Sequence, residues 1–141
     1  MVVGDLVRAA GACLGLVWGL PNTLLGLAFA GLSLTSVRYA RGVLVAESTR
    51  GLARVFLSRR GYSAITLGRV MITTVPLTPA LWVHELTHLE QSERWGLLFL
   101  PAYLYWYFRA GYHDNPFERA AVERAQAFLS GQATGSGPVD V

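Results

Sequence analysis

The residues best suited to chemistry stand in one short run, His84-Glu85-Leu86-Thr87-His88, which holds two of the three histidines in this 141-residue chain. On an α-helix, residues four apart lie on the same side, so both imidazoles can reach one metal ion. Glu85 is turned by about 100° from His84, which places its carboxylate beside the metal rather than on it. There it could take a proton from a metal-bound water. The spacing therefore predicts two metal ligands and a general base.

A helix must position these groups, and the flanking sequence supports one over residues 81–95. Thr78 is a suitable N-cap, and Pro79 suits the first helical turn. The helix has two sides that avoid water, which predicts a central position in the fold. One side carries both histidines with Gln91 and Trp95, and the other carries Trp82, Leu86 and Leu89.

A catalytic zinc site needs a third protein ligand and keeps a fourth position open for water. The downstream candidates are His113, Glu118 and Glu123. A last helix is expected from the N-cap Asn115 to about Leu129, and on its wheel Glu118 falls in the apolar arc, whereas Glu123 falls among polar residues. A carboxylate turned toward apolar side chains is costly unless it is paired or bound to a cation. We therefore expect Glu118 to complete the site, with His113 as the alternative ligand.

Other interpretations of these residues stay open. The five-residue pattern also arises by chance in core helices, in which case no third ligand exists. Glu118 could cap its helix by reaching back to the amide of Asn115. Asp114 could orient a ligating imidazole, and Gln91 could line the cleft.

The composition describes one domain that is unusually apolar. Hydrophobic residues make up 52% of the chain and charged residues 15%, against about 25% charged in ordinary soluble domains, and the mean hydropathy is +0.37. All twelve basic residues are arginine, their excess over acids is three, and no nucleic-acid-binding motif is present. The single cysteine, Cys13, excludes an intramolecular disulfide and a cysteine zinc cluster. We expect membrane contact to matter and nucleic acid not to be a partner.

The N-terminal segment is the strongest membrane signal, because residues 9–34 carry no charge and are long enough to cross a bilayer. Pro21, Asn22 and Thr23 lie at its midpoint, where proline would kink a helix and polar groups would need partners. Three interpretations follow: a membrane-embedded segment, a signal peptide cleaved near residues 28–30, or two short helices in the core or at a membrane surface. If the segment spans, the arginines that follow it place the catalytic part in the cytoplasm, and without membrane contact the protein would also be cytoplasmic.

The middle of the chain predicts strands around a short helix. Residues 42–46 and 64–74 are rich in β-branched residues, and Gly68 suggests a bulge or a close backbone approach. Residues 48–60 predict an amphipathic helix between them. Its apolar side consists of Leu52, Val55 and Phe56. We expect the two strands to pair antiparallel. The fold class is therefore α+β: a small antiparallel sheet packed on a helix bundle that carries the histidine helix.

The composition of two further segments predicts their structure. Residues 97–108 are apolar all round and rich in Tyr and Trp, but too short to cross a membrane. A buried helix is the first interpretation, and an element at the membrane interface is the alternative. Residues 131–141 are rich in glycine and lack periodicity, which predicts a disordered tail.

The run HELTHLEQ, followed downstream by NPFERAAVERA, resembles the gluzincin branch of the zincin metallopeptidases over about residues 64–129. In that branch two histidines and a glutamate from a later helix hold zinc. The resemblance implies His84, His88 and Glu118 as ligands and Glu85 as the base. It also implies that the preceding strand lies along the cleft and pairs with extended substrate.

The chain departs from larger gluzincins in two ways. Its glutamate is not in an N-E-x-x-S-D setting, and it has no separate substrate domain. For their transition-state-stabilising residue, only Tyr112 and His113 are positional candidates. We divide the chain into an apolar N-terminal segment (1–35), a zincin-like metal-binding domain (36–130) and a tail (131–141).

The expected function is hydrolysis of a peptide bond in a peptide or protein substrate, with Zn²⁺ as cofactor and Glu85 as general base. The alternative is a non-catalytic, membrane-associated zincin-like protein in which the same residues hold a structural zinc or bind a partner. A third interpretation is a small apolar helical protein at a membrane, with no metal.

Overall fold

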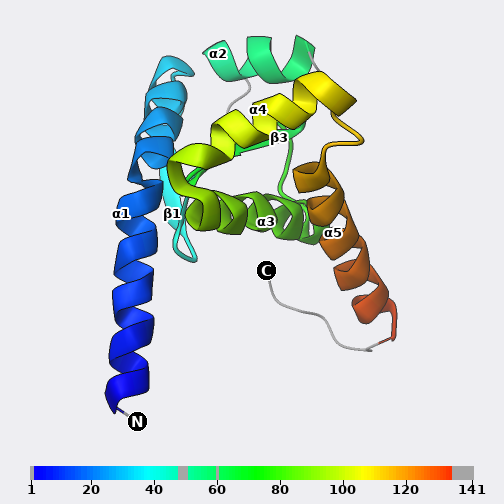
Figure 1. Cartoon of the computed structure of the whole chain (residues 1–141). Coiled ribbons are helices and arrows are strands. Elements are labelled where there is room, and N and C mark those ends of the chain that lie inside the picture. Colours follow the sequence, from blue (N-terminus) through cyan, green and yellow to red (C-terminus); the bar gives the residue numbers. More distant parts are fainter. Residues whose placement is uncertain (1, 48–50, 60, 135–141) are drawn as a thin grey trace.

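The structure, a computed structural model, describes residues 2–47, 51–59 and 61–134. Within them a four-stranded mixed sheet packs with helices (Figure 1), so the α+β prediction is confirmed. The strands are β1 (Val37–Ala40), β2 (Val43–Glu47), β3 (Ala64–Leu67) and β4 (Val70–Thr73), in the order β1-β2-β4-β3. The helical elements are α1 (Val2–Leu32), α2 (Gly51–Ala53), the π-helical turn η1 (Arg54–Ser58), α3 (Pro79–Trp95), the 3₁₀ turn η2 (Gly96–Leu98), α4 (Phe99–Ala110) and α5 (Pro116–Thr134).

The pairing of the two central strands differs from the expected one. β1 pairs with β2, and β3 with β4, in antiparallel fashion. β2 and β4, however, run parallel, with Val45 opposite Met71. The chain between them includes α2, η1 and β3, and a connection of this length can return to the same end of the sheet, as parallel pairing requires. The predicted antiparallel pairing around the helix is therefore wrong.

The strand predicted over residues 64–74 is two strands joined by a reverse turn at Gly68. Gly68 has a φ of 58°, a region that favours glycine. A Cβ there would lie 2.4 Å from the backbone nitrogen of Thr23 in α1. The close backbone approach is thus confirmed, whereas the suggested bulge is a turn. The backbone N–H of Arg69 donates to Thr23 Oγ1 at 3.1 Å, which holds α1 against this turn.

The N-terminal segment forms one continuous helix with Pro21 inside it, rather than two short helices. The polar side chains at its midpoint have partners in the domain or within the helix. Asn22 Nδ2 donates to the carbonyl of Gly96 at 2.8 Å, and Thr23 Oγ1 donates to that of Gly19 at 3.2 Å. Among the described residues, no helix combines the length and the apolar character that a membrane crossing needs.

The sheet is covered on both faces. On one face, side chains from α1 and from α2–η1 pack with the strands in a buried cluster of Ala30, Ala46, Ala53, Leu57, Val70 and Ile72. On the other face, Leu89 of α3 packs with Val43, Val45 and Met71. α3 crosses the middle of the molecule between α1 and α5 (Figure 1), so its predicted central position is confirmed.

The short helix between the strands presents a different side to the core than expected. Its buried residues are Ala53 and Leu57, which are four apart and so share one side. The predicted apolar side, formed by Leu52, Val55 and Phe56, is exposed. Residues 48–50 and 60 of the predicted helix lie outside the described residues.

The aromatic helix α4 is the clearest correction to the sequence-based picture. Phe99 is its one buried residue, whereas Leu104, Tyr105 and Phe108 are exposed, so the prediction of a buried helix is wrong. α4 lies beside α3 (Figure 1), and apart from Phe99 its side chains are exposed or half-buried. At the C-terminus, α5 continues to Thr134, and the rest of the predicted tail lies outside the described residues.

Candidate metal centre

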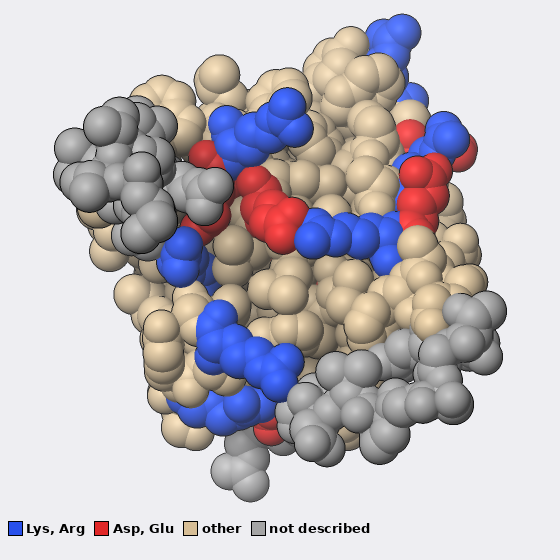
Figure 2. Space-filling model, turned by 90° about the horizontal axis from the view of Figure 1, so that it is seen from below, with Lys and Arg blue, Asp and Glu red and all other residues tan. Residues whose placement is uncertain are grey.

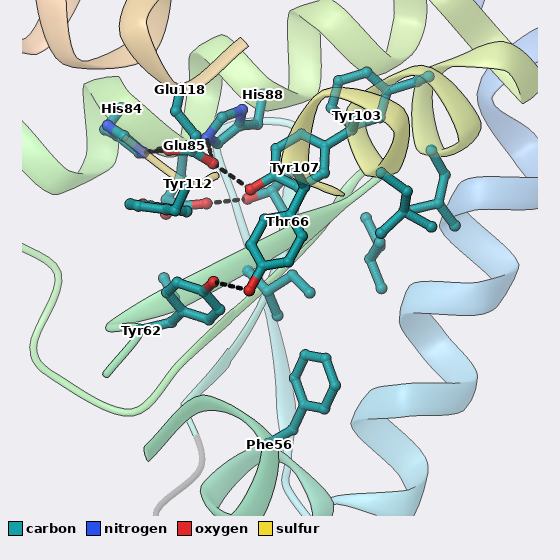
Figure 3. A pocket seen from close by; sticks show the side chains of 16 residues that line it. Phe56, Tyr62, Thr66, His84, Glu85, His88, Tyr103, Tyr107, Tyr112 and Glu118 are labelled. Carbon is teal, nitrogen blue, oxygen red and sulfur yellow. Dashed lines mark hydrogen bonds and ion pairs between the residues drawn. The ribbon is translucent and has the colours of Figure 1, made fainter. Parts of the chain in front are cut away.

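Three side chains from two helices meet beside one pocket (Figure 3). The Nε2 atoms of His84 and His88, both from α3, lie 3.2 Å apart. Glu118 from α5 completes the group: its Oε2 lies 3.3 Å from His84 Nε2, and its Oε1 lies 3.3 Å from His88 Nε2. Among the described residues this is the one group of three that could hold a metal ion. The structure thus brings together the three residues expected to bind it.

The start of α5 explains why Glu118 points inward. Asn115 Oδ1 accepts a hydrogen bond from the N–H of Phe117 at 3.0 Å, so the predicted N-cap is confirmed. Phe117 packs edge-on against Trp95 and Phe99, with ring centroids 5.5 and 5.4 Å apart, and this fixes the buried side of the helix. Glu118 follows Phe117 on that side and is only 4% exposed, as its place in the apolar arc predicted.

The spacing of these atoms suits a tetrahedral metal ion. Metal–ligand bonds of about 2.0–2.1 Å put neighbouring ligand atoms about 3.3 Å apart. The three contacts above are close to this spacing when both oxygens of Glu118 are used. With one ligand atom from each residue, the atoms lie within 4.8 Å of one another. Oε2 of Glu118 is buried and receives no hydrogen bond from a described residue. Its polar neighbour His84 Nε2 lies 3.3 Å away. A buried anionic oxygen is costly unless a cation meets it, and either a protonated imidazole or a divalent metal would do so, so the residues present are compatible with a divalent metal.

Gln91 fixes which nitrogen of His88 carries a proton. Its Nε2 donates to the carbonyl of Phe117 at 3.0 Å, so its Oε1 is the atom that lies 2.9 Å from His88 Nδ1. Because an amide oxygen only accepts, Nδ1 of His88 must donate. In the neutral ring, Nε2 then holds the lone pair and directs it at the other two candidate ligands. Gln91, expected to line the cleft, has this orienting contact instead.

The contact with Gln91 leads to a measurable prediction. Gln91→Ala should lower zinc affinity by about 10- to 100-fold, because the imidazole of His88 loses the partner that fixes its ring and tautomer. Titration against a competing chelator measures the change. Gln126→Ala, which alters an exposed residue of α5, is the matched control and should bind zinc as the wild type does. Equal affinities of the two variants would remove Gln91 from the site.

Without a metal, His88 and Glu118 act as an ion pair. Burial would lower the pKa of His88, but the hydrogen bond and negative charge of Glu118 outweigh it, so this pKa is raised. Burial would raise the pKa of Glu118, but contacts with His84 and His88 and the 2.6 Å hydrogen bond from Tyr103 bring it well below its usual range. The carboxylate is therefore ionised, and a proton competes with metal for His88.

This competition predicts how zinc binding depends on pH. Because the pKa of His88 is raised, its ring holds a proton at pH values where a free imidazole, with a pKa of about 6.5, has lost it. As the pH is lowered, zinc affinity should therefore begin to fall while the pH is still above about 6.5. Below the raised pKa of His88 it should drop by about tenfold per pH unit. Glu118 stays ionised over this pH range, so it does not add to the pH dependence of zinc affinity. Zinc titrations at a series of pH values measure the effect, and an affinity that stays constant below neutral pH would contradict it.

Glu85 lies beside this group but outside it, on the same helix. It is buried, and its Oε2 accepts a hydrogen bond from Thr66 of β3 at 2.6 Å. Burial raises the pKa of Glu85 above its usual value, even though the charge of His88 and the Thr66 hydroxyl oppose the rise. A carboxylate with a raised pKa is suited to take up a proton. The position agrees with the role that the spacing predicted.

Two tyrosines complete the polar part of the site. Tyr103 of α4 donates to Glu118 Oε1, and Tyr112 lines the same pocket as Glu85. Burial, followed by the negative charge of Glu118, raises the pKa of each phenol, so both stay protonated and can donate. Tyr112 was a positional candidate. Tyr103 and Thr66 were missed, because a tyrosine in an apolar run and a threonine in a strand give no signal of a polar contact.

The other predicted candidates stand apart. His113, Asp114 and Glu123 are exposed, and none belongs to the three-residue group. Glu123 lies on the polar side of α5, as the helical wheel predicted. The imidazole-orienting contact expected of Asp114 is made to His88 by Gln91.

The pocket beside the group is narrow and mostly apolar. Its volume is about 170 Å³, and its walls come from β3, α3, α4 and the turn η1 (Figure 3). Tyr62 and Tyr107 are hydrogen-bonded to each other through their hydroxyl oxygens at 3.1 Å, on the side of the pocket away from the histidines. Phe56 and Leu104 line it and are also exposed at the surface.

Comparisons with known proteins give no family. No protein-family model matches the chain, and neither a curated protein nor a solved structure matches it. The resemblance to gluzincins therefore rests on the sequence motifs and on the arrangement described above.

Proposed function

We propose that this protein is a zinc-dependent metallopeptidase that hydrolyses peptide bonds in a peptide or protein substrate. The observation that supports it is the meeting of His84, His88 and Glu118, whose ligand atoms lie within 4.8 Å of one another, with the buried carboxylate of Glu85 beside them. Two imidazoles and one carboxylate form the ligand set of one class of catalytic zinc site, which leaves a position for water.

Each residue then has a defined task. His84, His88 and Glu118 hold the ion, which when bound polarises a carbonyl and makes a water more acidic. Glu85 accepts the proton of that water and passes it to the leaving amine, as its raised pKa suits. Tyr112 stays protonated and can donate a hydrogen bond to the substrate carbonyl oxygen as negative charge develops there.

The sheet supports a peptide as substrate. β3 is an edge strand, because it stands last in the order β1-β2-β4-β3, and residues of β3 line the pocket beside Glu85. An edge strand offers backbone groups to an extended peptide, which can add to the sheet as a further strand. Such pairing would place a peptide bond near the candidate metal centre.

The proposal is tested by incubating the zinc-loaded protein with a broad peptide library and following cleavage by mass spectrometry. Cleavage that stops with a chelator and returns with zinc would support it. A protein that binds one zinc per chain but cleaves no peptide would instead favour a structural zinc. Elemental analysis showing no metal after refolding with zinc would contradict both the catalytic and the structural zinc site.

A further inference from the structure

Two residues that line the pocket, Phe56 and Leu104, belong to an exposed apolar surface. We use the term apolar face for the exposed side chains of η1 and α4, namely Val55, Phe56, Leu104, Tyr105, Trp106 and Phe108. Phe56 and Leu104 belong both to this face and to the pocket wall, so the face and the pocket are continuous. Single exposed apolar residues need no explanation, but a contiguous set beside a binding pocket marks an interaction surface.

The apolar face extends onto neighbouring elements. Phe29 of α1 contacts Phe56 edge-on, with ring centroids 5.8 Å apart, and η2, which leads into α4, is tied to α1 by the hydrogen bond from Asn22 to Gly96. Leu97 and Leu98 of η2 are exposed as well. η1 and η2 therefore both contact α1, and the exposed apolar side chains lie on η1, η2 and α4.

The charged residues on the described elements of this face have one sign. The described segments 51–59 and 96–110 contain no Asp or Glu, and their charged residues are Arg54, Arg59 and Arg109, all exposed. The surface seen in Figure 2 differs from the apolar face, because both acidic and basic side chains occur on it. An apolar face whose described elements carry arginines and no acids is complementary to a surface that is apolar inside and anionic at its border.

The geometry points to the surface of an anionic lipid bilayer as the occupant of the apolar face. Trp and Tyr combine an apolar ring with a polar tip and favour the membrane interface, where Tyr105 and Trp106 would lie. Arginines beside them would meet the lipid phosphates. A second copy of the chain fits less well, because a symmetric contact would bring arginines together with no acid on these elements to pair with them.

This orientation has a consequence for the substrate, which rests on the proposed function. With Phe56 and Leu104 at the lipid surface, the pocket opens toward the bilayer, and an apolar segment of a membrane-bound protein can reach it without passing through water. Membrane binding itself requires no catalysis. The two proposals therefore fail separately.

Sedimentation with lipid vesicles tests the inference on the zinc-loaded full chain. We expect binding to vesicles of phosphatidylcholine with phosphatidylserine and weaker binding to phosphatidylcholine alone. Phe108→Glu, which places a charge at a side chain that is 80% exposed, should weaken binding by at least about tenfold. Tyr39→Glu, at an exposed aromatic residue of β1 that is 75% exposed, is the matched control and should bind as the wild type does. Circular dichroism checks that both variants fold.

A second measurement locates the contact. Brominated lipid should quench tryptophan fluorescence on binding, and Trp106→Phe should remove part of that quenching. Wild-type protein that does not bind anionic vesicles, or Phe108→Glu protein that binds as tightly as the control, would overturn the inference. So would a change from dimer to monomer in Phe108→Glu without lipid, because the face would then be an interface between copies.

Discussion

Replacing Glu118 by alanine is expected to lower zinc affinity by at least about a hundredfold, more than the loss of a contact that only orients a ligand. The wild type should purify or refold with about one zinc per chain. Without Glu118 the ion keeps only two protein ligands, and the attraction of a buried carboxylate is lost. His84→Ala and His88→Ala should have effects of the same size. Zinc titration against a chelator, together with elemental analysis, measures all three.

Glu123→Ala is the matched control for this experiment, since it removes a carboxylate from the exposed side of the same helix. Its zinc affinity should equal that of the wild type, and its free energy of unfolding should change by less than about 0.5 kcal/mol. Glu118→Gln keeps the volume of the side chain and separates loss of a ligand from loss of packing. If Glu123→Ala or His113→Ala weakened zinc more than Glu118→Ala, the third ligand would have to be reassigned.

The second large effect concerns Glu85. Glu85→Gln should retain zinc within a few-fold but lower the rate of peptide hydrolysis by about 10²- to 10⁴-fold, the usual contribution of a general base. The amide keeps the size of the carboxyl group and can still hydrogen-bond Thr66, but it cannot accept a proton from water. Steady-state hydrolysis and zinc content are measured on the same preparation.

The pair of readouts separates the possible roles of Glu85. Glu123→Gln controls for the loss of one negative charge and should keep full activity. Zinc release from Glu85→Gln would show that Glu85 is a ligand. Unchanged hydrolysis would show that it is not the base.

The parts of the site that follow from local rules could be predicted. Four-residue spacing placed His84 and His88 side by side, and the cap at Asn115 fixed where α5 begins. The start of α5 then determined that Glu118 faces inward and Glu123 outward. These results depend on helix geometry alone, which the sequence encodes within a few turns.

The features that depend on distant contacts could not be predicted. Whether β2 and β4 run parallel depends on the path of the chain between them, which periodicity does not report. The composition of α4 shows that it is apolar but not whether another element covers it, so exposure was missed. Thr66 and Tyr103 acquire their roles only when β3 meets α3 and α4 meets the start of α5.

The division of the candidate ligands between α3 and α5 has a consequence for thermal stability. A bound ion would link the two helices and enclose η2 and α4 in a closed loop of the chain. Since metal binds the folded state in preference to the unfolded one, zinc at 100 times its dissociation constant would add about 2.7 kcal/mol to the free energy of unfolding. The melting temperature should then rise with free zinc concentration, and the helix that carries most of the apolar face would be held in place by an ion bound on its inner side.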